Sequence, residues 1–310
     1  MFFTLALWNL MVAETNRYGN QFLRSQEQIS PNFRVRQWRP VNVLEMKAFV
    51  AVLLEMGITR RPTIFSYWDR NSRAIPWFGN MFSRNRFQLI LKLFHLVNNE
   101  KLFPPGHQNY DPCSKFIPLV EHANRLFRFH YTPHQHLSID ESLIQYLRNK
   151  KHHKWGIKCW MLCDSVVHYC LGFFCYEGAK CEEKAEIKKK GLGHVVVTKL
   201  LQLGNYLSKG YHVVIDNFFT SIALAKYLFE NATYLTGTIR SNRRGLPKDI
   251  TADYDIGQVK YFRSDEILLC GFRKNLKRNW CCFFQPMPLL RMKHCIEDDI
   301  PKKEKYPNQQ

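Results

Sequence analysis

Apolar side chains recur at helical spacing over the first part of the chain. Residues 4–24 form a long mixed segment without Pro, and Asn42 and Ser83 stand where helix N-caps are expected. Glu45, three residues after Asn42, completes the spacing of a capping box. We therefore expect residues 1–132 to be all-helical. The apolar faces are Val43, Met46, Val50 and Leu53, then Phe87, Ile90, Phe94 and Val97, then Phe116, Val120, Ala123 and Phe127.

The pattern changes to an alternation of two at His136. Leu137 and Ile139 alternate with Ser138 and Asp140, which predicts a strand with the acid on the face opposite the apolar pair. The order of elements that follows predicts an α+β fold, in which a mixed β-sheet has flanking helices. We expect strands over 154–164 and 169–176, a solvated loop over 180–190, a helix over 194–207, a strand up to Asp216, another helix, and a strand over 234–239.

Asp216 ends a run of β-branched residues, Val213 to Ile215, which is typical of a short strand buried on both faces. Thr220 or Ser221 can cap a helix after it. An acid at the carboxyl end of a central strand lies where open α/β sheets place their chemistry. The alternative is an Asp that only caps its own turn, and this stretch does not decide between the two.

The rest of the chain is less regular. Segments 260–262 and 267–272 can form a hairpin, and the last residues are polar and irregular. We expect a helical domain over 1–132, a sheet domain over 133–242, a divergent β region over 243–296 and a disordered tail over 297–310.

The charge of the chain is strongly positive. It has 45 Lys and Arg against 26 Asp and Glu, a net charge of +19. This favours a polyanionic partner, first of all nucleic acid, over a generally basic soluble protein or a fragment that has lost its acidic part. Each basic run can also be a solvated face. The candidate DNA-binding residues are Arg148, Lys150, Lys151, Lys154 and Lys158, with Trp155 among them for stacking, and Arg240, Arg243, Arg244 and Lys248.

The 10 cysteines contain no C-x2-C pair, so we expect reduced thiols and no zinc finger. No apolar run is long enough to span a bilayer, and we expect no membrane association.

Asp140 and Asp216 can supply oxygen ligands to Mg²⁺ or Mn²⁺ if the two strand ends meet. Two such metals, about 3.5–4 Å apart, stabilise the attacking and leaving oxygens of a phosphodiester. The sequence therefore predicts a candidate metal site formed by these two acids.

Several short motifs resemble those of piggyBac-family transposases, of the transposable-element-derived type found domesticated in animal genomes. Their order and spacing match over most of the chain. The motifs are Thr15-Asn16-Arg17-Tyr18, Trp38-Arg39-Pro40-Val41, Glu55-Met56-Gly57-Ile58, Tyr67-Trp68, Ser83-Arg84-Asn85-Arg86-Phe87, Phe94-His95-Leu96, Leu137-Ser138-Ile139-Asp140-Glu141-Ser142, His153-Lys154-Trp155-Gly156-Ile157-Lys158 and Asp216-Asn217-Phe218-Phe219-Thr220-Ser221.

This resemblance implies a helical dimerisation and DNA-binding domain before a ribonuclease H-like catalytic domain, and a nuclear location. It implies three Asp residues that bind divalent metal for strand transfer at TTAA sites, with Asp140 first and Asp216 second. The third belongs beyond Gln310, and Asp298 and Asp299 do not match its context. The chain thus resembles a truncated or degenerate copy.

Three functions remain, in this order. The first is a transposase-derived DNA-binding protein without transposition activity. The second is a working metal-dependent transposase or nuclease. The third is a protein-interaction module that forms a homodimer or pairs with related transposases.

Overall fold

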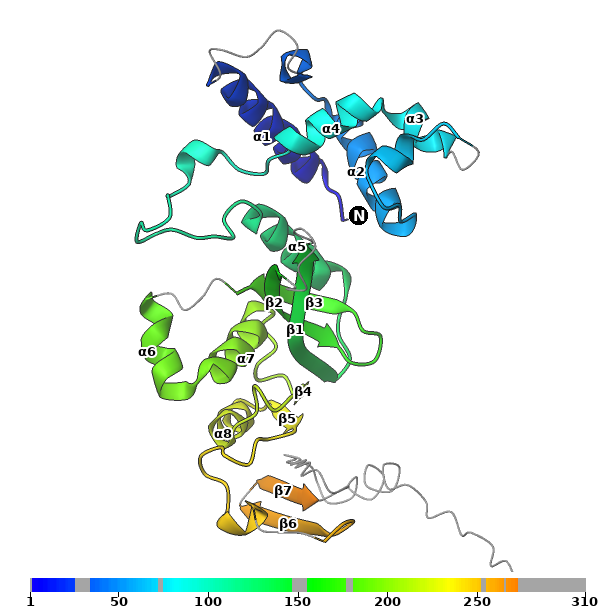
Figure 1. Ribbon diagram of the computed structural model, residues 1–310. Coiled ribbons are helices and arrows are strands. Elements are labelled where there is room, and N and C mark those ends of the chain that lie inside the picture. Colours follow the sequence, from blue (N-terminus) through cyan, green and yellow to red (C-terminus); the bar gives the residue numbers. More distant parts are fainter. Residues whose placement is uncertain are drawn as a thin grey trace, which may run out of the picture. The chain divides into compact units, whose positions relative to one another are not determined.

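The computed structural model describes residues 2–25, 34–71, 75–146, 155–176, 181–251, 255–264 and 266–272 (Figure 1). The chain divides into two compact units, Met1–Leu126 and Phe127–Gln310. The sequence-based boundaries at 132, 242 and 296 stay predictions.

The first unit is helical, as the apolar spacing predicts. Helix α1 begins after Thr4, whose hydroxyl accepts a hydrogen bond from the Leu7 amide. Helix α4 begins in the same way after Ser83 but ends at Leu93, so Phe94 and Val97 lie beyond it. The helices are α1 (Leu5–Arg24), α2 (Val43–Ile58), α3 (Pro76–Met81), α4 (Arg84–Leu93) and α5 (Ile117–His130), the last of which continues into the second unit.

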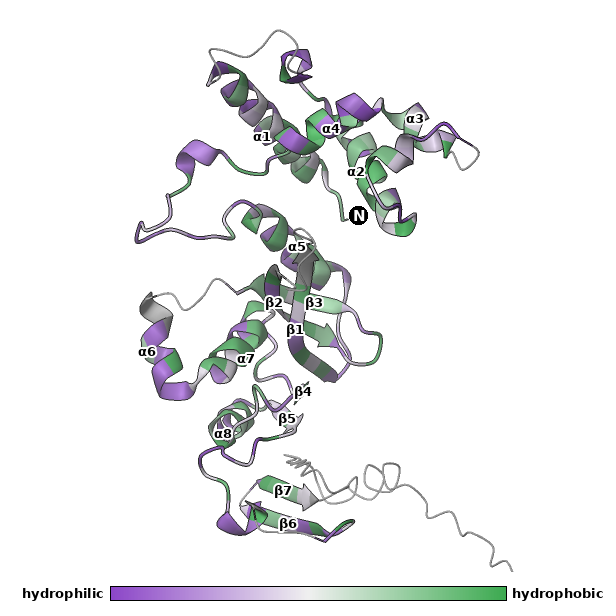
Figure 2. Ribbon diagram, viewed as in Figure 1, coloured by the Kyte–Doolittle hydropathy of each residue, from purple (hydrophilic) through white to green (hydrophobic). Residues whose placement is uncertain are grey.

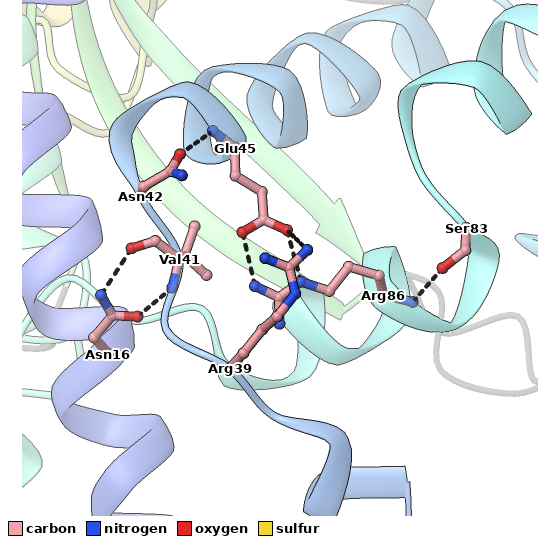
Figure 3. A network of polar contacts seen from close by, with 7 residues as sticks. All are labelled: Asn16, Arg39, Val41, Asn42, Glu45, Ser83 and Arg86. Carbon is pink, nitrogen blue, oxygen red and sulfur yellow. Dashed lines mark hydrogen bonds and ion pairs between the residues drawn. The ribbon is translucent and has the colours of Figure 1, made fainter.

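A network of polar contacts joins α1, α2 and α4 (Figure 3). The Asn16 side chain donates to the carbonyl of Val41 at 2.8 Å and accepts from its amide at 2.7 Å. Asn42 caps α2 through the Glu45 amide, as predicted. The Glu45 carboxylate, which we expected to complete a capping box, binds the Arg86 guanidinium with two bonds of 2.7 Å. A buried cation within reach explains why the carboxylate turns to α4.

The second unit contains a five-stranded mixed sheet in the order β3-β2-β1-β4-β5. Strand β1 pairs antiparallel with β2 and parallel with β4, and β5 pairs parallel with β4. This is the predicted mixed sheet. The strands are β1 (His136–Tyr146), β2 (Trp155–Asp164), β3 (Cys170–Cys175), β4 (His212–Ile215) and β5 (Tyr234–Gly237).

Helices α7 (Leu192–Leu203) and α8 (Ile222–Glu230) pack on one face of the sheet and enclose its core. Val213 and Ile215 of β4 point into this core and are 0% and 4% exposed, whereas Val214 is 41% exposed. The prediction that β4 is buried on both faces is therefore wrong, because α7 and α8 cover only the face that carries Val213 and Ile215.

Within the predicted loop over 180–190, residues Cys181–Lys190 form a helix, α6, so the predicted loop is wrong. Its mixed charge indicates a segment exposed to solvent, and Figure 2 shows α6 to be mostly hydrophilic. Lys, Glu and Ala are nevertheless strong helix formers. Lys190 pairs with Glu186 one turn earlier at 2.9 Å, an i,i+4 spacing that supports a helix.

Beyond β5 the structure describes the predicted hairpin, with β6 (Val259–Ser264) antiparallel to β7 (Ile267–Phe272). Ile267 and Leu269 of β7 belong to the same buried cluster as the sheet. The hairpin therefore packs as part of the second unit.

Candidate functional site

Asp140 and Asp216 occupy equivalent places on neighbouring strands. The parallel register of β1 and β4 pairs Ile139 with Ile215, and each acid is the next residue along its strand. Both isoleucines are buried, so the alternation of strand side chains turns both acids away from the core. Both Asp residues are exposed. The register thus brings the two predicted acids together at one edge of the sheet.

Each carboxylate is partly engaged by its own backbone. Asp140 accepts from the Glu141 amide at 2.7 Å, and Asp216 accepts from the Phe218 amide at 2.9 Å, in both cases through Oδ1. Within the described part of the chain, no hydrogen bond engages Oδ2 of either residue. Asp216 follows the end of β4 as predicted, but Asp140 lies within β1, which continues to Tyr146, so the prediction of two strand ends is wrong for Asp140. Exposed carboxylate oxygens on neighbouring strands are the ligands that Mg²⁺ and Mn²⁺ prefer, so the two residues fit such an ion.

The turn after Asp216 is held from two sides. Its carbonyl accepts from the Thr220 hydroxyl at 2.7 Å and from the Thr220 amide at 3.2 Å. Arg243 donates to the carbonyls of Asn217 at 3.1 Å and Phe218 at 2.6 Å, and Arg240 donates to the Asn217 side chain at 3.0 Å. The turn therefore does more than cap itself, because a distant loop fixes it.

Arg243 is half-buried, whereas its neighbour Arg244 is exposed. Burial lowers its pKa, neighbouring Arg240 lowers it further, and Asp216 acts in the opposite direction. Its Nε atom is buried without a hydrogen-bond partner in the described structure. A guanidinium held in this way supports the Asp216 turn, whereas exposed Arg244 and Lys248 beside it face solvent.

Two glycines allow close packing around the same turn. A Cβ on Gly193, in the first turn of α7, would lie 2.7 Å from Cα of Phe219 and 3.0 Å from the carbonyl oxygen of Phe218. A Cβ on Gly237 would collide with the carbonyl of Ile215 and lie 2.7 Å from the Thr220 hydroxyl. We did not single out either glycine from sequence. An isolated Gly inside a strand is the available signal for Gly237, since it marks close approach of another backbone.

The side chain of Lys158 contacts other residues of this protein. Its ammonium group lies 2.9 Å from the Glu141 carboxylate and 4.2 Å from the centre of the Trp160 ring. Trp160 is buried and stacks on Phe218 at 5.6 Å, so this cluster also borders the Asp216 turn. The remaining predicted contacts, Arg148, Lys150, Lys151 and Lys154, lie outside the described residues, as do Asp298 and Asp299.

Among the described residues, no group of three or more His, Cys, Asp or Glu side chains is placed to hold a metal ion. Every helix of the described chain is too short or too polar to cross a lipid bilayer.

A sequence model of the family described as Transposase IS4 matches residues 1–306. PiggyBac transposable element-derived protein 3 of Homo sapiens is 28% identical over 215 residues, which cover 64% of this chain and 34% of that protein. PiggyBac transposable element-derived protein 5 of Homo sapiens is 24% identical over 254 residues, which cover 76% of this chain and 46% of that protein. The chain thus spans less than half the length of these two relatives.

The fold matches a piggyBac transposase whose cryo-EM structure was solved as a synaptic complex with hairpin DNA. The TM-score is 0.76 at 23% identity, over 92% of this chain and 59% of that one. The predicted α+β class, with a helical region before a ribonuclease H-like mixed sheet, is confirmed by this likeness. Because the family match covers nearly the whole sequence and the relatives are piggyBac proteins, the chain belongs to the Transposase IS4 family, in its piggyBac type.

Proposed function

We propose that this protein binds double-stranded DNA and does not itself carry out transposition. The observation that carries the proposal is the adjacent placement of Asp140 and Asp216 beside a loop with Arg240, Arg244 and Lys248. A polyanionic strand that approaches the two acids meets these cations, and the net charge of +19 adds long-range attraction.

We expect no transposition activity because the described residues place two carboxylates at the site. Asp140 and Asp216 fit one Mg²⁺ or Mn²⁺ ion, which would supply charge stabilisation at a bound phosphate. The resemblance to piggyBac transposases implies three such acids. Stabilisation of the transferring phosphate supplies most of the catalysis in phosphoryl transfer, and loss of one ligand should lower the rate by orders of magnitude. Among the described residues, no third carboxylate joins Asp140 and Asp216, so the proposed protein keeps the geometry of a metal site that these residues leave incomplete.

The related chain solved with hairpin DNA supports the choice of duplex DNA as partner. The proposal includes a nuclear location, which the resemblance to piggyBac-family proteins implies, and a helical unit that mediates a homodimer or pairing with related transposases. These parts of the proposal are tested by imaging of the full chain in cells and by its mass in solution.

Duplex binding is tested by titration of the full chain with a labelled duplex at several salt concentrations. Affinity should fall steeply with salt, with a slope of about −0.9 in log K against log salt for each phosphate contact. The double variant Arg244→Ala with Lys248→Ala should bind more weakly and reduce the magnitude of that slope by about 2. Absence of binding at low salt would favour the protein-interaction alternative.

The matched control removes two exposed lysines elsewhere in the second unit. Lys209 precedes β4, at the end of that strand opposite Asp216, and Lys226 lies on α8. Lys209→Ala with Lys226→Ala changes the net charge equally and should leave most of the slope unchanged. Equal losses in both double variants would show that only total charge matters.

Catalysis is tested with Mg²⁺ or Mn²⁺ and supercoiled plasmid or hairpin DNA. We expect no cleavage above that of the Asp216→Ala variant. Robust nicking that requires Asp216 would overturn the inactive assignment and establish the metal-dependent nuclease.

A further inference from the structure

Strands β2 and β3 carry four cysteines in two directly opposed pairs. The antiparallel register places Cys159 opposite Cys175 and Cys163 opposite Cys170. All four are thiols in the structure. Directly opposed residues of an antiparallel pair have Cα atoms about 4.5–5.5 Å apart, which lies within the span of a disulfide. Cys159 and Cys175 can therefore be bridged with little movement of the backbone, and the hydrogen bond between the Cys163 and Cys170 side chains places those two thiols within reach of each other as well.

The two pairs differ in exposure. Cys159 and Cys175 are buried, 1% and 7% exposed, with their sulfur atoms 3.3 Å apart. Cys163 and Cys170 are only half-buried, next to the turn that joins β2 to β3. The two strands thus hold one closed pair in regular register and one accessible pair just beyond a shift of register between Leu162 and Cys163.

The accessible pair lies beside the candidate site. Cys163 is opposite Ser138 of β1, and Asp140 is opposite Met161, so Cys163 and Asp140 are diagonal neighbours on one face of the sheet. A hydrogen bond from the Cys170 thiol lowers the pKa of Cys163, while burial and the charge of Asp140 oppose that shift. The same hydrogen bond raises the pKa of Cys170. The hydrogen bond between the two thiols shows that their sulfur atoms face each other on adjacent strands.

We propose that Cys163 and Cys170 form a reactive dithiol, which small-molecule disulfides convert to a cross-strand disulfide beside Asp140. This modification site does not depend on the proposed DNA binding.

The reaction consists of two exchanges. The Cys163 thiolate attacks one sulfur of the small disulfide, forms a mixed disulfide and releases one thiolate. Cys170 then loses its proton and attacks the Cys163 sulfur, which forms the bond between the two cysteines and releases the second thiolate. The two protons of the cysteine thiols end on the two released small thiols. The cysteines are oxidised and the small disulfide is reduced.

The test uses the reduced full chain and oxidised glutathione. After timed exposure, remaining thiols are alkylated and the chain is digested for peptide mapping by mass spectrometry. Because no Lys or Arg lies between Cys159 and Lys180, trypsin leaves all four cysteines in one peptide, and chymotrypsin is added to separate them. We expect a peptide pair linked through Cys163 and Cys170, before any link between Cys159 and Cys175.

Two variants give a matched comparison. Cys159→Ser with Cys175→Ser should retain the loss of two thiols from this peptide, and Cys163→Ser with Cys170→Ser should abolish the early loss. Circular dichroism checks that both fold, and the map of the unsubstituted chain decides the matter even if one does not. Full alkylation of Cys163 and Cys170, earlier oxidation of the buried pair, or a glutathione adduct on Cys163 that never resolves would each overturn the proposal.

Discussion

Asp140 and Asp216 are each one residue beyond the paired Ile139 and Ile215, on strands that run in the same direction. One acid lies within a long strand that continues to Tyr146, and the other lies in a turn directly after a short strand. The position of Asp140 is therefore fixed by its pairing with Met161 of β2, whereas that of Asp216 depends on the contacts of its turn.

Gly237→Ala should displace the Asp216 turn. The added methyl group would collide with the Ile215 carbonyl and approach the Thr220 hydroxyl, which itself holds the Asp216 carbonyl. We expect a loss of about 1–3 kcal/mol in the free energy of unfolding, as for other overpacked sites. Urea unfolding measures this.

The control for this change is Gly79→Ala in α3, where the added methyl group would meet nothing within 4 Å. Alanine favours a helix over glycine, so this variant should be as stable as the original chain or slightly more so. A neutral Gly237→Ala would show that the turn yields easily.

Arg243→Ala should weaken folding more than it weakens DNA binding. The guanidinium donates to two backbone carbonyls and is half-buried, and a hydrogen bond that involves a charged group contributes about 1.5–3 kcal/mol. Arg244→Ala, its exposed neighbour, should change the free energy of unfolding by less than about 0.5 kcal/mol. Urea unfolding and duplex titration of both variants separate the two roles. Equal free energies of unfolding for the two variants would show that Arg243 does not support the Asp216 turn.

The site was predictable where strand periodicity governs it. The alternation of apolar and polar residues predicted that Asp140 lies on the other face of the strand from Leu137 and Ile139. A run of β-branched residues that ends in an acid indicated Asp216 as the second candidate. The contacts that hold the Asp216 turn were not predictable. In the sequence Arg243 is one of several cations in a basic loop, and only the folded chain brings it to the carbonyls of Asn217 and Phe218. Lys158 reads as a phosphate contact for the same reason, since its partner Glu141 lies on another strand.

The fold shows the same limit. Caps at Thr4, Asn42 and Ser83 depend on local sequence, and the structure uses Asn42 and Ser83 as predicted. The helix over 181–190 was missed because mixed charge describes both a solvated loop and a solvated helix, and the choice rests on propensity and i,i+4 pairing. The exposure of Val214 depends on which face α7 and α8 cover, and the strand itself does not encode that.

Asp164 should make stability depend on pH in the acid range. It is fully buried at the end of β2, and burial would raise its pKa. Hydrogen bonds from the His134 amide and ring, the Val166 amide and the Tyr131 hydroxyl outweigh this and hold the pKa well below its usual range. The unfolded pKa of Asp is about 3.9, so the stabilisation is complete above that pH and is lost as the pH falls below it.

Asp164→Asn should therefore be less stable than the original chain by several kcal/mol at pH 7, and the difference should shrink below about pH 4. The exposed control Asp255→Asn should stay within about 0.5 kcal/mol at pH 7. Buried His212, whose pKa burial and His136 lower to about 4, contributes a separate loss as the pH falls below about 6.5. Urea unfolding from pH 7 to pH 3 separates the two ranges, and a constant Asp164→Asn difference throughout would contradict the role of Asp164.

The Glu45–Arg86 pair should stabilise the helical unit far more than the neighbouring Glu45–Arg39 pair (Figure 3). Glu45 and Arg86 have side chains 11% and 10% exposed, and Arg86 also lies 5.0 Å from the Trp38 ring. Glu45→Gln leaves the nearly buried Arg86 cation without its carboxylate and should cost about 3–5 kcal/mol. Arg86→Met should cost less, because Arg39 still pairs with the Glu45 carboxylate. Arg39 is 67% exposed at 3.1 Å, and Arg39→Ala should cost less than about 1 kcal/mol.

A double-mutant cycle distinguishes pairing from the loss of two independent contacts. Once Glu45 is neutral, Arg86→Met should cost less than it does in the original chain, because the buried cation has already lost its partner. We expect a coupling of about 0.5–3 kcal/mol between Glu45 and Arg86, measured by urea unfolding. The cycle of Glu45 with Arg39 should give a coupling close to zero, since solvent screens that pair. Additive effects in the Arg86 cycle would mean that the ion pair contributes nothing beyond the packing of its two side chains.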